Sequence, residues 1–148
     1  MAEVISFDEQ AYEIIDVPRD GNCFFSTLSL GLTSSLESAH SLRQIITSEI
    51  LQAWNQYKEL ISIYQDFSWT KEKYRLKMKE GGDWATQLEI QVAANLFKKK
   101  IVVHAKTEKT NKYLTIETVP EHQTNVENST MHVILSMQEG HYYYLRKM

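Results

Sequence analysis

The sequence predicts an α+β domain with a small, mostly antiparallel central sheet flanked by helices. Apolar residues recur at three- and four-residue steps through much of the first two thirds of the chain, as in amphipathic helices. Runs of β-type residues gather mainly in the last third. Such segregation is typical of α+β proteins. No repeat or linker interrupts the 148 residues, so we expect residues 1–148 to form one domain with a substantial core.

The first predicted elements are a strand and a helix joined by a turn. Residues 12–17 form a β-type run that ends at Pro18, because proline supplies no donor to a strand ladder. A helix is expected from about Cys23 to Gly31, where glycine can close it in the left-handed conformation. Residues 1–11 lack periodicity and are expected to be a polar lead-in.

Three further helices are expected before the main group of strands. The first carries one continuous apolar stripe, at Leu42, Ile45, Ile46, Ile50, Trp54, Tyr57 and Ile61. The second is lysine-rich, covers about residues 70–79 and ends at Gly81-Gly82. The third begins with Thr86 and Glu89 at capping-box spacing and continues to Phe97.

The strands of the last third are short and separated by polar segments. They are expected at residues 101–104, 113–117, 131–135 and 141–145. A turn at residues 138–140 joins the last two strands. Residues 106–112 and 120–130 are polar and are expected to be loops.

The composition narrows the class of partner. A formal net charge of -3 and a pI near 5.9 argue against nucleic-acid binding by phosphate attraction. No apolar run approaches the roughly 20 residues that cross a bilayer, and the first residues lack the features of a signal peptide. A single cysteine cannot form an internal disulfide, which favours a reducing compartment. We therefore expect a monomer in the cytoplasm (the host cytosol for a microbial or viral protein) that binds neither nucleic acid nor membrane.

Cysteine chemistry is the strongest functional signal in the chain. Cys23 lies at the predicted strand-to-helix turn, where a helix N-terminus can stabilise a thiolate. A buried, inert thiol could occupy the same position. One cysteine without close histidine pairs has no zinc-ligand spacing, and neither a phosphate-binding glycine loop nor a Gly-x-Ser-x-Gly motif occurs. No metal or other cofactor is expected.

A cysteine nucleophile needs a base, which is usually a histidine distant in sequence. The chain has five histidines, at His40, His104, His122, His132 and His141. His40 and His122 lie in polar surroundings. His104 and His132 lie within apolar strands, where a histidine usually has a structural role. His141 directly follows Gly140 and opens the last strand, which favours it as the base.

Three motifs, in order, resemble the ovarian-tumour (OTU) family of cysteine proteases. The stretch Asp20-Gly21-Asn22-Cys23-Phe24-Phe25 resembles the signature around the family's nucleophile. Residues Trp84 to Ile90 resemble its Trp-Gly-Gly-x-x-Glu-Leu segment, and His141-Tyr142 resembles its catalytic His-Tyr. The likeness covers roughly residues 17–145. It implies a papain-like fold and hydrolysis of isopeptide or peptide bonds after the C-terminal Gly-Gly of ubiquitin or polyubiquitin.

The resemblance also implies roles for the matching residues. Cys23 is the nucleophile, His141 is the general base, and Asp20 shapes the loop before the nucleophile. Backbone N–H groups of Asn22 and Cys23 form the oxyanion hole, whose donors each contribute on the order of 2.7–4 kcal/mol. Trp84 walls the passage for the Gly-Gly tail.

Further contacts with ubiquitin are expected beside this passage. The arginines of the ubiquitin tail call for an acidic subsite, for which Glu89, Asp83 and Glu80 are candidates. Tyr142 is a further candidate for substrate binding.

Two positions depart from the family pattern. Tyr143 stands where many relatives have Asn or Asp to orient the histidine, and Ala85-Thr86 stands where Gly-Gly is common. The orienting group is then the Tyr143 hydroxyl, a backbone carbonyl or an upstream acid such as Asp16. The presence of Tyr143 favours a second hypothesis, in which the protein is a catalytically weak member of the family that binds ubiquitin without cleaving it. A protease for a ubiquitin-like modifier, or for a viral or microbial polyprotein, is the other alternative.

Overall fold

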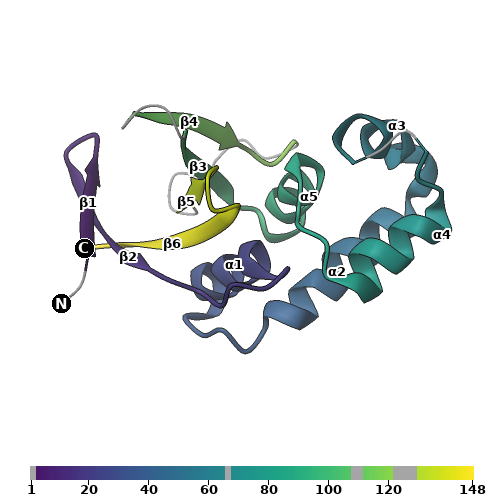
Figure 1. Cartoon of the computed structure of the whole chain (residues 1–148), viewed down its shortest axis with the longest axis horizontal. Helices are drawn as coiled ribbons and strands as arrows, with labels where there is room; N and C mark the ends of the chain where they lie inside the picture. The colour runs from purple at the N-terminus through teal and green to yellow at the C-terminus, as the bar shows by residue number, and fades with distance from the viewer. Residues whose placement is uncertain (1–2, 66–67, 108–111, 122–129) are drawn as a thin grey trace.

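The strands form one curled sheet, and the helices lie against one face of it (Figure 1). The computed structural model describes residues 3–65, 68–107, 112–121 and 130–148. The strands are β1 (Glu3–Phe7), β2 (Gln10–Ile15), β3 (Lys100–Lys106), β4 (Tyr113–Thr118), β5 (Thr130–Ser136) and β6 (His141–Lys147). The helices are α1 (Cys23–Thr33), α2 (Ala39–Gln52), α3 (Trp54–Tyr64), α4 (Lys71–Tyr74), the π-helix η1 (Arg75–Gly81) and α5 (Gln87–Phe97).

The sheet has the strand order β1-β2-β6-β5-β3-β4. Within the described strands, β3 and β5 run parallel and every other neighbouring pair runs antiparallel. The sheet is therefore mixed but mostly antiparallel, and the α+β prediction is confirmed. β6 lies between β2 and β5, so the strand that begins with His141 is central.

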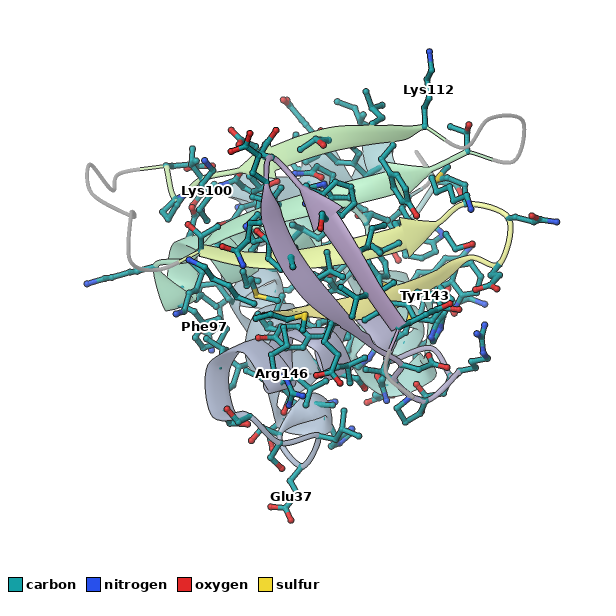
Figure 2. The ribbon with its side chains drawn as sticks, turned by 90° about the vertical axis from the view of Figure 1, so that its left-hand side faces the viewer. Glu37, Phe97, Lys100, Lys112, Tyr143 and Arg146 are labelled. Carbon is teal, nitrogen blue, oxygen red and sulfur yellow. The ribbon has the colours of Figure 1, made fainter. Side chains whose placement is uncertain are left out.

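The hairpin of β1 and β2 folds over the sheet face that the helices leave open. Figure 2 shows this hairpin crossing in front of the other strands. At its tip, Phe7 of β1 stacks on His104 of β3 with ring centroids 3.8 Å apart. A small apolar cluster, centred on Tyr12, Ile134 and Leu145, lies under the hairpin. The larger core lies on the opposite face, between the sheet and the helices.

The larger core supplies most of the buried apolar area. Its fully buried members on α1, α2, α3, η1, β3 and β5 include Phe25, Leu28, Ile46, Ile50, Ile61, Met78, Ile101 and Val133. Burial of each such side chain contributes about 1.5–3 kcal/mol relative to leaving it exposed. Among the described helices, none has the length and apolar character that crossing a membrane requires.

The predicted start of α5 is confirmed in detail. The Thr86 side chain accepts from the backbone of the first helical turn, while the Glu89 carboxylate accepts from the Thr86 N–H at 2.7 Å. This reciprocal pair satisfies N–H groups that a helix start otherwise leaves without partners. The cap fixes where residues 83–86 join the helix.

Three sequence expectations differ from the structure. Residues 3–7 form β1 and are not a lead-in, because Asp8 and Glu9 adopt positive φ angles and close a tight hairpin without glycine. The stripe from 42 to 61 divides into α2 and α3 at Ala53, whose backbone leaves the helical region. Gly31 does not end α1; a Cβ there would lie 3.1 Å from the Met131 sulfur, so the glycine allows close packing, and Ser34 closes the helix at φ 61.

Candidate active site

The nucleophile loop, residues 18–22, leads from β2 into α1. The Asp20 carboxylate accepts from the Asn22 N–H at 2.9 Å, which closes a turn before the helix. Cys23 is the first residue of α1, as predicted, and only 3 % of its surface is exposed. The thiol is therefore at a helix N-terminus, which favours negative charge.

His141 opens β6 directly after the turn at Gly140, where φ is +62. Its Nε2 lies 2.8 Å from Oδ1 of Asp16, which follows the end of β2. Backbone hydrogen bonding from Tyr142 reaches the Cys23 thiol, so the thiol lies beside the residue that follows His141. Because Asp16 engages Nε2, the other ring nitrogen, Nδ1, lies outside this contact.

The protonation of Cys23 reflects two opposing influences. Burial is the larger and raises the pKa of the thiol, while hydrogen bonds from the backbone of Tyr142 and Phe24 lower it. In the resting site, burial therefore favours the neutral thiol over the thiolate.

Asp16 is the orienting group among the alternatives that the sequence left open. The Tyr143 hydroxyl donates to Glu139 and accepts from Arg19, both at 2.6 Å. The Tyr143 ring meets the His141 ring edge-on, with centroids 4.8 Å apart. Tyr143 therefore contacts His141 through its ring, whereas the carboxylate of Asp16 holds the ring nitrogen.

One predicted oxyanion donor is wrong in this conformation. The Asn22 N–H donates to the Asp20 side chain and is not free to meet a substrate oxygen. The Cys23 N–H faces the Asp20 carbonyl at 3.4 Å, which is long for a hydrogen bond. The Cys23 N–H is therefore the more available of the two. The loop-shaping position predicted for Asp20 agrees with its contact.

Trp84 lies beside the catalytic turn. A Cβ added to Gly140 would lie 2.4 Å from the Trp84 indole, so the ring covers this glycine directly. An open cavity of about 350 Å³ is lined by residues 19–21, Trp84 and residues 139–141. Trp84 itself is 55 % exposed. Trp84 therefore forms part of the wall of this cavity, next to His141.

Two predicted substrate contacts are wrong. Glu89 is fully buried, and its oxygens accept from Thr86 and from the Tyr74 hydroxyl, so it cannot form a surface subsite. Burial raises the pKa of this carboxyl against those hydrogen bonds. Tyr142 is 8 % exposed, and its ring packs edge-on against Phe24. Its side chain belongs to the core.

The other histidines lie away from this site. His104 and His132 hydrogen-bond each other at 3.0 Å under the β1–β2 hairpin, and His132 also meets the Tyr12 hydroxyl. His40 is exposed on α2, and His122 lies outside the described residues. In the described part of the chain, no three acidic, histidine or cysteine side chains gather in an arrangement suited to a metal ion.

Sequence reasoning missed the buried Arg43 of α2. Its guanidinium donates to the side chain of Asn22 and to the carbonyls of Gly21, Met78 and Asp83. The available signal was its position: residues 43, 46, 47 and 50 share one face of a helix, so an arginine stood within the predicted apolar stripe.

A buried thiol at a helix N-terminus contacts the backbone of the residue that follows a carboxylate-bound histidine, which is an arrangement expected of a cysteine hydrolase. Comparison with known families agrees with this class. Residues 18–143 match the family described as OTU-like cysteine protease. The chain belongs to this family, as the three sequence motifs indicated.

Curated relatives come from Arabidopsis thaliana. Ovarian tumor domain-containing deubiquitinating enzyme 10 is 30 % identical over 60 % of this chain and 23 % of its own length. Enzyme 12 of the same series is 31 % identical over 74 % of this chain and 46 % of its own length. The chain thus spans about a quarter to a half of the length of these relatives.

Solved structures share the fold at low sequence identity. The viral OTU domain protease from Dera Ghazi Khan virus matches with a TM-score of 0.74 at 20 % identity, over 99 % of this chain and 86 % of that one. The OTU domain of OTUD1 matches with a TM-score of 0.73 at 14 % identity, over 90 % of this chain and 85 % of that one. The Hazara virus OTU bound to ubiquitin matches with a TM-score of 0.67 at 15 % identity, over 99 % and 87 %.

Proposed function

We propose that this protein is a deubiquitinase that cleaves isopeptide or peptide bonds after the C-terminal Gly-Gly of ubiquitin. The observation that carries the proposal is the 2.8 Å contact between His141 and Asp16, next to a thiol at the N-terminus of α1. Relatives named as deubiquitinating enzymes and an OTU structure bound to ubiquitin support the choice of substrate. The monomeric chain would act in a reducing compartment such as the cytosol, because the reaction requires a reduced Cys23.

The first half of the proposed reaction forms a thioester. His141 takes the thiol proton at Nδ1 while Cys23 Sγ attacks the carbonyl carbon of the terminal glycine. The carbonyl oxygen gains negative charge and takes the Cys23 N–H as a donor. The C–N bond then breaks, and the leaving amine receives the proton from His141. Asp16 accepts from Nε2 and stabilises the imidazolium between these steps.

The second half regenerates the thiol. A water loses a proton to His141 and attacks the thioester carbonyl carbon. The C–S bond breaks, the thiolate recovers the proton from His141, and ubiquitin leaves as a carboxylic acid that loses its own proton to solvent. The same histidine thus serves as base and acid in each half, and no cofactor enters either step.

The cavity beside His141 suits a tail without side chains. Gly140 is covered by the Trp84 ring, and Gly21 lies against the backbone of Gly82 on the other wall. A passage bounded by such contacts favours glycine at the two positions before the scissile bond. Glu139 and Asp20, which line the cavity, replace Glu89 as candidate partners for the tail arginines.

A ubiquitin suicide probe with a C-terminal electrophile tests the proposal directly. We expect one covalent adduct on the native chain, none on Cys23→Ala, and release of fluorophore from ubiquitin carrying a C-terminal dye. If the native chain binds ubiquitin but neither reacts nor turns over, it is the weak binding relative that Tyr143 suggested. Reaction confined to ubiquitin-like probes would assign it to another modifier. A panel of di-ubiquitins then defines linkage preference.

A further inference from the structure

The buried guanidinium of Arg43 joins two segments that are far apart in the sequence. Only 2 % of Arg43 is exposed, yet each of its three nitrogens donates a hydrogen bond. Nε meets Oδ1 of Asn22 at 2.5 Å, and Nη1 meets the Met78 carbonyl. Nη2 meets the Gly21 carbonyl at 2.6 Å and the Asp83 carbonyl at 2.7 Å. One nitrogen therefore holds the nucleophile loop to the segment that carries Trp84.

These two segments also touch directly. A Cβ added to Gly21 would lie 1.5 Å from the Gly82 carbonyl oxygen, so no other residue fits at position 21 without separating them. Arg43 thus bridges two segments whose backbones already touch at Gly21 and Gly82. Its hydrogen bonds fix the relative position of the two walls of the cavity.

The far end of the Trp84 segment is held by a second buried charge. Glu89 accepts from the Thr86 N–H, while Arg43 holds the Asp83 carbonyl. Burial lowers the pKa of the Arg43 guanidinium, and Glu89 is the largest influence that opposes this shift. Residues 83–86 are therefore fixed at both ends by buried side chains of opposite charge.

The same contacts orient the peptide before the nucleophile. The carbonyl of Gly21 and the N–H of Asn22 belong to one planar peptide and point in opposite directions. Arg43 binds the carbonyl and Asp20 binds the N–H, at 2.6 and 2.9 Å. Rotation of this peptide would break both bonds, so its orientation is set before substrate arrives.

We propose that Arg43 is a positioning residue that couples Trp84 to the nucleophile loop and so sets the spacing of the passage for the ubiquitin tail. This inference rests on the proposed function. The partners of Arg43 include neither Cys23 nor His141. Its removal should therefore misplace the substrate relative to the thiol while leaving proton exchange between the thiol and the histidine unchanged.

The test compares Arg43→Lys with the native chain and with Arg75→Lys as a matched control. Arg75 pairs with Glu72 and Glu80 on the surface, and neither carboxylate lines the cavity beside His141. Lysine keeps the charge at position 43, but one ammonium cannot reproduce the planar fork that reaches four acceptors. Turnover of dye-labelled ubiquitin is measured per site labelled by the suicide probe, which removes the effect of any unfolded fraction.

We expect kcat per labelled site to fall by about tenfold to a hundredfold in Arg43→Lys, as for a small misplacement of reacting groups. The pH profile of Cys23 alkylation by iodoacetamide should match the native profile, and Arg75→Lys should match it in both assays. Native kcat in folded Arg43→Lys overturns the proposal. An altered alkylation profile also overturns it, because Arg43 would then act on the thiol. A native chain that the probe does not label instead rejects the proposed function.

A second pair of variants keeps the test decisive if Arg43→Lys does not fold. Gly21→Ala drives a methyl group into the Gly82 carbonyl, whereas Lys77→Ala shortens an exposed side chain of η1. We expect Gly21→Ala to lose kcat per labelled site with the native alkylation profile, and Lys77→Ala to resemble the native chain. Equal activity of the two alanine variants would show that the spacing of these segments does not matter.

Discussion

Two histidine environments on the same sheet differ in their partners and not in their burial. His141 and His104 are each 3 % exposed. His141 faces the carboxylate of Asp16, whereas His104 faces His132 and the hydroxyl of Thr115. A carboxylate stabilises an imidazolium, but a second imidazole and a hydroxyl do not. The first environment therefore suits a base in the proposed reaction, while the second supports structure.

The largest expected effect comes from removing the catalytic base. We expect His141→Ala to lower the turnover of dye-labelled ubiquitin by about 10⁴-fold or more, because the variant lacks the proposed base for the thiol proton. His132→Gln should keep near-native turnover per folded molecule, because His132 lies under the β1–β2 hairpin. Near-native turnover in His141→Ala would contradict the assignment and direct attention to His104 or His132.

The next effect tests the carboxylate partner. We expect Asp16→Asn to lower kcat by about 10²- to 10⁴-fold, because the asparagine amide can donate to Nε2 and leave the ring proton on Nδ1, facing the thiol. Asp16→Ala permits either tautomer and should lose less. Measuring kcat for both variants at saturating substrate tests whether Asp16→Asn loses more activity than Asp16→Ala. If Asp16→Asn is as active as the native chain, another group orients His141.

The paired histidines make a different prediction, about acid stability. Burial is the main cause that lowers the pKa of His132 to about 4 from its ordinary value of 6.5, with His104 the next contributor. Below pH 6.5 the unfolded state binds a proton that the folded state does not, so stability falls as the pH drops from 6.5 to about 4. The loss is on the order of 2 kcal/mol after allowance for solvent screening.

Denaturant titration across this pH range measures that loss. His132→Gln can still accept from Tyr12 and cannot be protonated, so its stability should depend less steeply on pH. His40→Gln, an exposed control on α2, should keep the native slope. Equal slopes for all three proteins would show that the pair under the hairpin does not titrate in this range.

The smallest effect concerns Tyr143. We expect Tyr143→Asn to keep activity within about threefold, because Asp16 continues to hold His141. Loss of the hydroxyl bonds to Arg19 and Glu139 should lower stability only slightly, because both partners are exposed to solvent. Thermal unfolding and steady-state kinetics separate the two outcomes. A severe loss of kcat would show that the edge-on ring itself orients the histidine.

Local chemistry explains which parts of this structure could be predicted from sequence. The Thr86 cap, the strand that opens with His141 and the helix that opens with Cys23 each depend on neighbours in the chain, and each was found. Glu89 was wrongly assigned to a surface subsite because a glutamate that caps a helix and a glutamate on the surface cannot be told apart by residue type. Only the burial of α5 against Tyr74 distinguishes them.

Long-range contacts set the limit of the prediction. Asp16 was one of several possible partners for His141, 125 positions away, and the sequence alone could not choose among them. Arg43 was missed because a helical stripe predicts which face is buried but not which carbonyls gather around a buried cation. The hairpin of β1 was missed because its turn, Asp8-Glu9, uses neither glycine nor asparagine.

The central position of β6 has a consequence for the order in which the molecule becomes complete. β6 lies between β2 and β5, so β1 and β2 have no place in the sheet until residues 141–147 have been synthesised. Asp16 and His141 meet through that same pairing, in which Ile15 stands opposite Tyr144. Pairing of such distant segments is slow relative to local helix formation. A growing chain that already carries the nucleophile helix therefore has neither its base nor its carboxylate in place, and the proposed hydrolysis requires that the sheet first close.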